Sequence, residues 1–481
     1  MLPSMRSVWI KNFGCQMNVY DAARLTGVLQ GRGYRVVETP EEAHVIILNT
    51  CHVREKATEK VFSDLGRLRL LKEGPLAPKI VVTGCVAQAL GKEILQRTPW
   101  VDLVVGPHAV HKIPALLADL SYTPVASSER RAVSTENCGD GMCGPSTWKA
   151  ARVFLDGSAA EKFQEPSPSP LPAFASSSVT AFLPIQEGCD NFCTYCVVPY
   201  TRGREFSRPV TTILAEARDL LQRGVSEITV IGQNVNAYRG ENEQHTPCDF
   251  GTLLCRVAAL PGLRRLRYTT SHPWYVNDSL LLAHATLPQL MPFVHLPAQS
   301  GSDRVLNAMH RPYTVRDYLM AVDKLRSVQQ EIAFSSDFIV GFPGETEQDF
   351  QETLSLVARV TYAQAYAFKY SPRAGTPAAS FPDAVPEAIK EERLARLLEV
   401  LASQQHTFNL QSLEQVVPVL FEKPGRHSGE CTGRTPHFQS VSVSIDQDHI
   451  GRCLPVRITE VLPHSLKGIV EQSAEDRPHL H

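Results

Sequence analysis

Apolar runs that alternate with amphipathic helical segments divide the chain into patterned regions. In the first region, residues 6–122, three strand-like runs each lead into a cysteine, and they cover Ser7–Gly14, Ala43–Thr50 and Lys79–Gly84. Alternating strands and helices predict a parallel sheet, whose strands all end at one edge. Cys15, Cys51 and Cys85 are therefore expected to meet there and to hold an iron–sulfur cluster. A single cysteine at a strand end is more often structural, and the prediction depends on all three.

The second region, residues 175–407, continues this alternation. Its strand-like runs cover Thr180–Gln186, Glu227–Ile231, Arg265–Thr270, Phe293–Leu296, Ile332–Val340 and Ala363–Tyr370. Helical segments such as Thr211–Arg223 and Arg316–Gln329 lie between them. Six strand–helix units predict a partial (β/α)6 barrel, in which functional residues belong at the carboxyl ends of the strands.

The third region, residues 408–474, consists of short β-rich runs separated by turns, which predict a small all-β, OB-like barrel of five strands. The runs cover Val416–Phe421, Gly429–Gly433, Ser440–Ile445, Cys453–Val461 and Gly468–Glu471. Such barrels often bind RNA, but acidic and basic residues are nearly balanced here. Arg434, His437 and Phe438 are either contacts for an unpaired base or ordinary surface residues.

Residues 123–174 lose both periodicities and are predicted to be a linker or insertion. Glu165–Pro172 is rich in proline and serine, a composition typical of extended joints between domains. Cys138 and Cys143 lie in this stretch as C-G-D-G-M-C. They are a labile pair, a metal site or incidental residues, and the sequence leaves their role open.

A compact cysteine motif, C-x3-C-x2-C, follows the first strand of the second region. Cys189, Cys193 and Cys196 can converge from one loop onto one iron–sulfur cluster. Three cysteine ligands leave one iron of a [4Fe–4S] cluster open, and an open iron can bind a small ligand. Zinc is the alternative, but zinc sites usually combine two C-x2-C knuckles or Cys and His pairs. Buried structural cysteines are less compatible with the loop residues Gly188 and Asp190 around them.

Composition adds limits rather than a function. A chain of 481 residues exceeds one ordinary core, and 43% hydrophobic with 20% charged residues is typical of a globular protein. The formal charge of −2 gives no global sign of a nucleic-acid partner. Without a long apolar run or a signal-like start, no membrane contact and a cytoplasmic location are expected. Twelve cysteines then favour metal or redox chemistry over disulfides, and we expect a monomer.

Several longer motifs resemble the radical S-adenosylmethionine (SAM) methylthiotransferases, within them the tRNA-2-methylthio-N6-dimethylallyladenosine synthases. The motifs are K-N-F-G-C-Q-M-N from Lys11, L-N-T-C-H-V-R-E-K-A from Leu48, G-C-D-N-F-C-T-Y-C-V-V-P-Y-T-R-G from Gly188, G-Q-N-V-N-A-Y from Gly232, T-T-S-H-P from Thr269 and S-S-D-F-I-V-G-F-P-G-E-T from Ser335. The resemblance covers nearly the whole chain except the linker. It implies an N-terminal cluster domain, a radical SAM barrel and a C-terminal TRAM domain.

The resemblance further implies two [4Fe–4S] clusters and bound SAM. The cluster on Cys189, Cys193 and Cys196 would generate a radical from SAM, and the cluster on Cys15, Cys51 and Cys85 would supply sulfur. Polar residues and glycines at the strand ends are the expected SAM contacts: Gln233, Asn234, Ser300, Gly341, Gly344 and Glu345.

The implied substrate is an isopentenylated adenosine in a tRNA anticodon loop, a base that can be presented unstacked. An electron donor and a sulfur source are the other implied partners. Arg202, Arg204 and Arg208 are candidate phosphate contacts. The alternatives are a methylthiotransferase for threonylcarbamoyl-adenosine in tRNA or for a ribosomal-protein aspartate, and an electron-transfer protein with an RNA-binding module. The last would use fully ligated clusters, which two sets of three cysteines do not provide.

Overall fold

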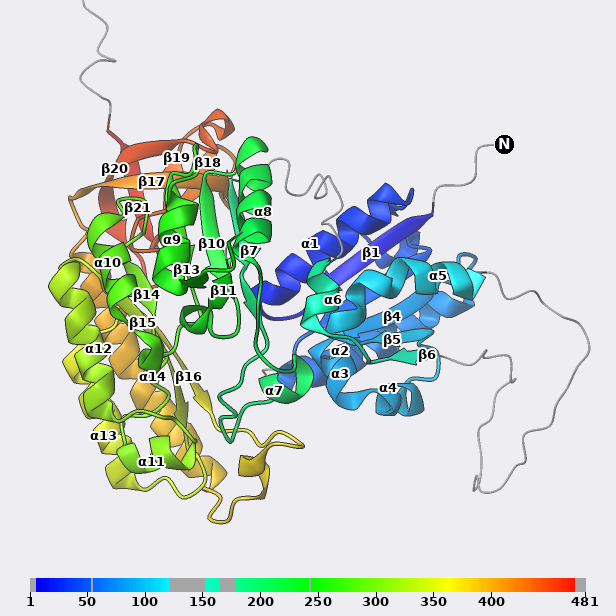
Figure 1. Cartoon of the computed structure of the whole chain (residues 1–481), viewed down its shortest axis with the longest axis horizontal. Coiled ribbons are helices and arrows are strands. Elements are labelled where there is room, and N and C mark those ends of the chain that lie inside the picture. Colours follow the sequence, from blue (N-terminus) through cyan, green and yellow to red (C-terminus); the bar gives the residue numbers. More distant parts are fainter. Residues whose placement is uncertain (1–5, 53–54, 122–151, 165–178, 242–243, 472–481) are drawn as a thin grey trace, which may run out of the picture. The chain divides into compact units, whose positions relative to one another are not determined.

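The computed structural model describes residues 6–52, 55–121, 152–164, 179–241 and 244–471, and it divides into two compact units, residues 1–172 and 173–481. Figure 1 labels the elements of each unit. Cys138 and Cys143, whose role the sequence left open, lie outside the described residues. No helix in these ranges is both long enough and apolar enough to cross a membrane.

The first unit is a parallel sheet with the strand order β2-β1-β3-β4-β5-β6. The strands are β1 (Ser7–Asn12), β2 (Arg35–Val36), β3 (Val45–Thr50), β4 (Lys79–Gly84), β5 (Leu103–Val105) and β6 (Arg152–Phe154). The helices are α1 (Gln16–Gly31), α2 (Glu55–Leu68), α3 (Cys85–Leu90), α4 (Lys92–Arg97), α5 (Ile113–Ser121) and α6 (Ala159–Gln164). The central strands β3 and β4 are largely apolar because the sheet is buried on both faces, with one hydrophobic cluster around Leu48 and another around Ile47.

Three of these strands, β2, β5 and β6, were not predicted, and β6 lies in a segment that differs most from the expectation. Residues 152–164, which the sequence assigns to the linker, form β6 and α6, and β6 pairs in parallel with β5. The buried Lys162 of α6 forms an ion pair with Asp21 of α1 (2.7 Å). The sequence signal is weak because β6 has only three residues and stands between long stretches rich in glycine, proline and serine.

The second unit contains the predicted partial barrel. Its parallel strands are β7 (Thr180–Pro184), β10 (Glu227–Ile231), β13 (Arg265–Tyr268), β14 (Phe293–His295), β15 (Ala333–Val340) and β16 (Gln364–Lys369). A parallel bridge between Leu266 and Leu290 joins the β13 side to the β14 side. The helices are α7 (Val198–Thr201), α8 (Val210–Gln222), α9 (Phe250–Ala258), α10 (Asp278–Thr286), α11 (Asp303–Ala308), α12 (Val315–Val328), α13 (Glu347–Val360) and α14 (Glu387–Leu410). The predicted (β/α)6 architecture is confirmed.

Two short antiparallel strand pairs lie in the loops of this barrel, and the sequence analysis did not predict them. They are β8 (Gln186–Glu187) with β9 (Phe206–Ser207), and β11 (Arg239–Glu241) with β12 (Pro247–Asp249). Strands of two or three residues give no readable alternation, so sequence periodicity cannot detect them.

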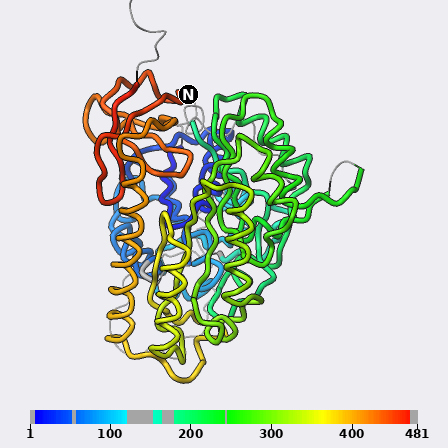
Figure 2. The backbone as a smooth tube through the Cα atoms, turned by 90° about the vertical axis from the view of Figure 1, so that its left-hand side faces the viewer, coloured from blue at the N-terminus to red at the C-terminus, as the bar shows by residue number. Residues whose placement is uncertain are grey.

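The C-terminal segment is a closed five-stranded barrel with the order β17-β18-β19-β21-β20, as predicted. Its strands are β17 (Val416–Pro424), β18 (Glu430–Arg434), β19 (Ser440–Ser444), β20 (Cys453–Val461) and β21 (Leu466–Val470). The long helix α14 leads into this barrel, as the orange-to-red part of Figure 2 shows. Val419, Phe421, Val441 and Val456 are among the residues that fill its interior.

The small barrel contacts the start of β13. Arg265 donates to the carbonyl oxygens of Arg434 (2.7 Å) and Pro418 (2.8 Å), and Arg267 donates to that of Pro436 (2.8 Å). The Phe438 ring packs against the Arg267 guanidinium at 4.9 Å.

The residues that the sequence singled out for RNA contact in this barrel therefore contact other parts of the protein. Phe438 also stacks with Phe293 (5.4 Å between ring centroids) and with Arg434 (4.1 Å). His437 lies 2.9 Å from the carbonyl oxygen of Glu331. Phe438 and His437 attach the small barrel to the rest of its unit.

Candidate active site

The three N-terminal cysteines lie at one edge of the first sheet. Parallel pairing places Asn12 opposite Asn49 and Thr50 opposite Gly84, so the strands that precede the cysteines end side by side. Cys15 is the N-cap of α1, Cys51 follows β3 directly, and Cys85 is the first residue of α3. A helix N-terminus favours the thiolate form of a cysteine, which is the form that binds iron.

Gly14 shows how closely two of these loops approach. Its φ of +99° lies in the region that favours glycine, and a Cβ built there would fall 2.7 Å from the Cys51 Sγ. Because Gly14 immediately precedes Cys15, the Cys15 and Cys51 loops are in direct contact. This approach requires a residue without a side chain at position 14.

Buried amides brace this edge. Asn49 Nδ2 donates to Asn12 Oδ1 (2.9 Å) and to the Asn18 carbonyl oxygen (2.8 Å), while Asn18 Nδ2 donates to the Phe13 carbonyl oxygen (2.8 Å). Asn18 Oδ1 lies 3.5 Å from Cys15 Sγ. The amides therefore fix the backbone around the cysteines through loop hydrogen bonds.

In the second unit, the C-x3-C-x2-C loop follows β8 at the carboxyl end of β7. Gly188 has a φ of +84°, and a Cβ there would overlap the backbone of Arg204. Within the loop, the Cys189 N–H donates to the Gly203 carbonyl (3.2 Å) and the Cys196 N–H to that of Cys193 (2.9 Å). The loop is thus folded back on its own stem.

Partners from elsewhere in the barrel hold this loop. Thr194 donates its backbone N–H to the Met309 carbonyl (3.1 Å) and its hydroxyl to that of Ala308 (2.8 Å). Arg311 Nη1 donates to Cys193 Sγ (3.4 Å). No sequence motif had singled out Arg311, yet it holds the side chain of a predicted cluster ligand.

Two of the three arginines proposed as phosphate contacts are internal. Arg202 pairs with Glu187 (2.8 Å) and Arg208 with Glu216 (2.7 Å), and all four side chains are buried. Arg204 is exposed and remains a candidate. The buried pairs anchor the segment that follows the cluster loop, so the expectation for Arg202 and Arg208 was wrong.

Gln233 and Asn234, which the sequence predicts as SAM contacts, lie at the carboxyl end of β10. Gln233 Oε1 accepts from the Gly188 N–H (2.7 Å), which ties Gln233 to the cluster loop. Asn234 is 2% exposed, and neither polar atom of its side-chain amide has a hydrogen-bond partner among the described residues. A buried amide without partners is costly unless a ligand satisfies it, which fits a polar ligand such as SAM.

His272, at the neighbouring strand end, shows the same property. It is 4% exposed; its Nδ1 accepts from the Trp274 N–H (3.3 Å), and its Nε2 has no partner in the described chain. Burial, helped by the charge of Arg311, lowers the pKa of His272 to about 2, so the ring is neutral and Nε2 carries the hydrogen. Asn236 joins the two strand ends through paired hydrogen bonds to the His272 backbone (2.8 Å each).

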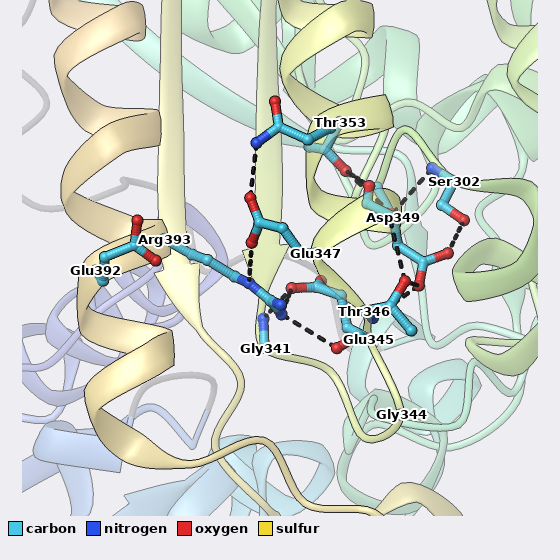
Figure 3. Close-up of polar contacts among 12 residues, drawn as sticks. Ser302, Gly341, Gly344, Glu345, Thr346, Glu347, Asp349, Thr353, Glu392 and Arg393 are labelled. Carbon is cyan, nitrogen blue, oxygen red and sulfur yellow. Dashed lines mark hydrogen bonds and ion pairs between the residues drawn. The ribbon is translucent and has the colours of Figure 1, made fainter.

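The G-F-P-G-E-T turn after β15 is shown in Figure 3. Glu345 turns inward: its Oε1 accepts from the Gly341 N–H (2.9 Å) and pairs with Arg393 of α14 (2.8 Å). Burial raises the pKa of Glu345, and the Gly341 N–H and Arg393 oppose that rise. Glu345 thus braces the turn, while Gly341 (φ +71°) and Gly344 (φ +77°) provide its backbone conformation.

Ser300 is also used within the fold. Its Oγ accepts from the Ser302 N–H (3.2 Å) and lies 3.4 Å from the Thr353 hydroxyl. The Ser302 hydroxyl in turn donates to Asp349 (2.6 Å). Asp349 and Thr346 together form the capping box of α13. Of the six predicted SAM contacts, Asn234 has the clearest unmet hydrogen-bonding capacity.

Backbone strain marks the same edge of the barrel. Thr270 (φ +65°) and Gln299 (φ +69°) follow β13 and β14, and both are non-glycine residues in the left-handed region. Such residues cost about 1–3 kcal/mol each and cluster at functional sites. This signal is independent of the cysteines and points to the same strand ends.

The two cysteine sets fit iron–sulfur clusters. Burial raises the pKa of Cys189 to about 11 and of Cys196 to about 12, so a bound metal would have to supply the charge that holds them as thiolates. No three Cys, His, Asp or Glu side chains in the described ranges are placed to hold a single metal ion. In a cluster, however, each cysteine binds a different iron, so its sulfurs need not converge on one point.

Comparisons with known proteins agree with this division. A family model described as uncharacterized protein family UPF0004 matches residues 7–106, the Radical SAM superfamily model matches residues 183–357, and the TRAM domain model matches residues 413–470.

Solved structures show a similar fold. The cobalamin-dependent S-adenosylmethionine radical enzyme OxsB matches with a TM-score of 0.50 and 14% identity over 83% of this chain, which spans only 56% of OxsB. The radical S-adenosylmethionine methyltransferase TsrM from Kitasatospora setae matches with a TM-score of 0.52 and 15% identity, over 78% of this chain and 74% of TsrM. The chain contains a radical SAM domain, and the order UPF0004, Radical SAM and TRAM is the domain architecture typical of methylthiotransferases.

Proposed function

We propose that this protein is a methylthiotransferase of the MiaB type, a tRNA-2-methylthio-N6-dimethylallyladenosine synthase. It would convert N6-isopentenyladenosine, immediately 3′ of the anticodon, to its 2-methylthio derivative. The observation that carries the proposal is the repetition of one design in both units: parallel strands end beside three cysteines, and buried partners hold the loops.

The chemistry requires more than acid–base catalysis. The adenine carbon that receives sulfur is not acidic enough for a side-chain base, so a radical is needed. When bound, SAM and the cluster on Cys189, Cys193 and Cys196 would supply that radical, and the cluster on Cys15, Cys51 and Cys85 would supply sulfur. A second SAM would donate the methyl group.

The chain's own residues would position these groups. Arg311 orients and stabilises the Cys193 sulfur. Asn234 and His272 offer buried hydrogen-bonding groups that a polar ligand can satisfy. Gly341 and Gly344 allow a ligand to approach the backbone closely.

RNA as the substrate is supported by the TRAM domain match and by the motifs that resemble tRNA-modifying members. Arg204, exposed behind the cluster loop, is the candidate phosphate contact. The reaction also requires an electron donor and a source of replacement sulfur. Two [4Fe–4S] clusters would give about eight irons per chain.

Mass spectrometry of tRNA nucleosides tests the proposal. Cells that lack the protein should accumulate N6-isopentenyladenosine and lose its 2-methylthio form, and the wild-type gene should restore it. Loss of methylthio-threonylcarbamoyl-adenosine instead, or of a methylthio group on a ribosomal-protein aspartate, would assign the protein to another methylthiotransferase branch.

A further inference from the structure

A hollow of about 420 Å³ lies in the second unit, among residues that follow β10 and β13. The loop after β10, the β11–β12 hairpin and the segment 274–277 form its walls. Ala237, Tyr238, Pro247 and Trp274 give the lining a largely apolar character. Its volume lies at the lower end of the range for small-molecule pockets, roughly 300–1,000 Å³.

Trp274 is the most unusual residue of this hollow. Its side chain is 57% exposed, whereas large aromatic rings usually bury most of their surface. The ring's attachment is nevertheless fixed, because its backbone N–H donates to the His272 ring (3.3 Å) within a short 3-10 turn, Pro273–Tyr275. An exposed aromatic ring on a fixed backbone at a pocket rim offers a face on which a planar ligand can stack.

Tyr275 connects the hollow to the cluster loop. Its hydroxyl donates to Asn191 Oδ1 (3.2 Å), and Asn191 lies between Cys189 and Cys193. The Tyr275 ring also packs against His272 with centroids 5.5 Å apart. A ligand in the hollow would therefore be separated from the cluster loop by a single side chain.

We propose that this hollow binds the nucleobase of a nucleotide that neighbours the modified one in the RNA loop, by stacking on Trp274. The inference rests on the proposed function, which brings a single-stranded loop to the cluster. Unpaired bases are commonly recognised by stacking on aromatic rings and on arginine. Arg239, an exposed cation that also lines the hollow, is placed to contact the attached phosphate.

The acidic residue of the hollow limits what can enter. Burial alone would raise the pKa of Asp249. Hydrogen bonds from Ser279, Thr252 and Asn277 outweigh burial and hold this pKa below its usual range. An ionised carboxylate repels phosphate, so the base rather than the backbone occupies the interior. Because these three bonds already use Asp249, stacking dominates over base-edge recognition, and the hollow should tolerate different bases.

The test uses the iron-loaded full-length protein and RNA stem-loops that carry N6-isopentenyladenosine, with each neighbouring loop nucleotide made abasic in turn. Trp274→Ala should weaken stem-loop binding by about tenfold, and Trp274→Phe should bind nearly as the wild type does. One abasic position should weaken binding to the wild type but not to Trp274→Ala, because both changes remove the same contact. Met320→Ala, which replaces an exposed apolar side chain of α12 outside the hollow, should have no effect.

Iron content and thermal unfolding check that each variant folds. Equal binding of every stem-loop by the wild type and Trp274→Ala, or equal sensitivity of both proteins to every abasic position, would overturn the inference and leave the proposed function standing. If the wild type neither binds nor methylthiolates any stem-loop, the proposed function itself fails. If Trp274→Ala instead loses modification of a ribosomal-protein substrate, the hollow recognises a peptide and not a nucleobase.

Discussion

The two three-cysteine sites reach similar arrangements by opposite routes. In the first unit the cysteines are 36 and 34 positions apart, and only the pairing of β1, β3 and β4 brings their strand ends together. In the second unit they lie within eight residues of one loop, which Arg311, Met309 and the Arg202–Glu187 pair hold in place. The first site therefore depends on the integrity of a whole sheet, and the second on the contacts of one loop.

Removing one cysteine from each set should have the largest and most distinct effects. Cys193→Ala should leave about half of about eight irons and abolish SAM cleavage. Cys51→Ala should also lose about half of the iron but keep SAM cleavage, and it should stop sulfur insertion. Iron assays and quantification of 5′-deoxyadenosine after reduction measure both results.

The control for this pair is Cys255→Ala, which removes a thiol on α9 outside both sets. It should keep the full iron content. SAM cleavage by Cys193→Ala, or methylthiolated product from Cys51→Ala, would contradict the division of labour between the two sites.

Buried ion pairs offer a second comparison, and we take one from each unit. Arg202→Met removes the cation that pairs with the buried Glu187 carboxylate, and Lys162→Met removes the cation that pairs with Asp21. Each change should lower the free energy of unfolding of its own unit by about 3–5 kcal/mol, because removing one partner of a buried ion pair is strongly destabilising. Hydrogen exchange monitored by mass spectrometry would locate the loss.

Matched double variants sharpen this prediction. Arg202→Met with Glu187→Gln, and Lys162→Met with Asp21→Asn, remove both charges and should recover part of the stability. Loss of protection in both units from one single variant would show that the two units do not fold independently.

Glycine substitutions separate backbone strain from steric overlap. Gly84→Ala and Gly188→Ala should each destabilise by more than about 2 kcal/mol, because a Cβ would meet the Thr50 carbonyl in one case and the Arg204 carbonyl in the other. Gly33→Ala and Gly224→Ala have similar positive φ angles but open space around the Cβ, so they should cost only about 1 kcal/mol. Equal costs within each pair, in thermal or denaturant unfolding, would mean that the overlap is relieved by small backbone shifts.

The sequence predicted the architecture well because long strands carry a clear pattern. β10 (Glu227–Ile231) and β20 (Cys453–Val461) have the predicted bounds, and the other strands of the two barrels differ by a few residues. β6 was missed because three residues among glycine- and proline-rich stretches carry no periodicity. Its position is set by pairing with β5, a tertiary effect.

The role of a site residue was predictable where the residue type alone decides it. It was not predictable where the role depends on which partner the side chain contacts in the fold. Strand order predicted that Cys15, Cys51 and Cys85 follow neighbouring strand ends, as the pairing of β1, β3 and β4 shows, and the binding of clusters by both cysteine sets stays a prediction. Glu345 looked like a ligand contact because it follows a glycine-rich turn, yet Arg393, 48 positions away, takes its carboxylate. His272 was recognised only as part of the T-T-S-H-P motif, and Arg311 was missed, because their importance comes from burial and from contacts made across the barrel.

Acid should weaken the second unit. Burial lowers the pKa of His284 to about 4 and of His272 to about 2, and both lie in the second unit. Below pH 6.5 the unfolded chain protonates these histidines while the folded unit does not, so its stability falls as the pH drops from 6.5 towards 4. Each histidine contributes a slope of about 1.4 kcal/mol per pH unit.

His284→Gln tests this sign. The glutamine can keep a hydrogen bond to Tyr268, which His284 Nε2 contacts at 2.7 Å, but it binds no proton in this range. In the variant, the free energy of unfolding should fall less steeply with decreasing pH, by the contribution of one histidine. At pH 5, hydrogen exchange in the second unit should therefore be slower than in the wild type, once the rates of both proteins are normalised to pH 7.5. An unchanged slope would mean that His284 already takes up its proton in the folded unit, despite its burial against Tyr268.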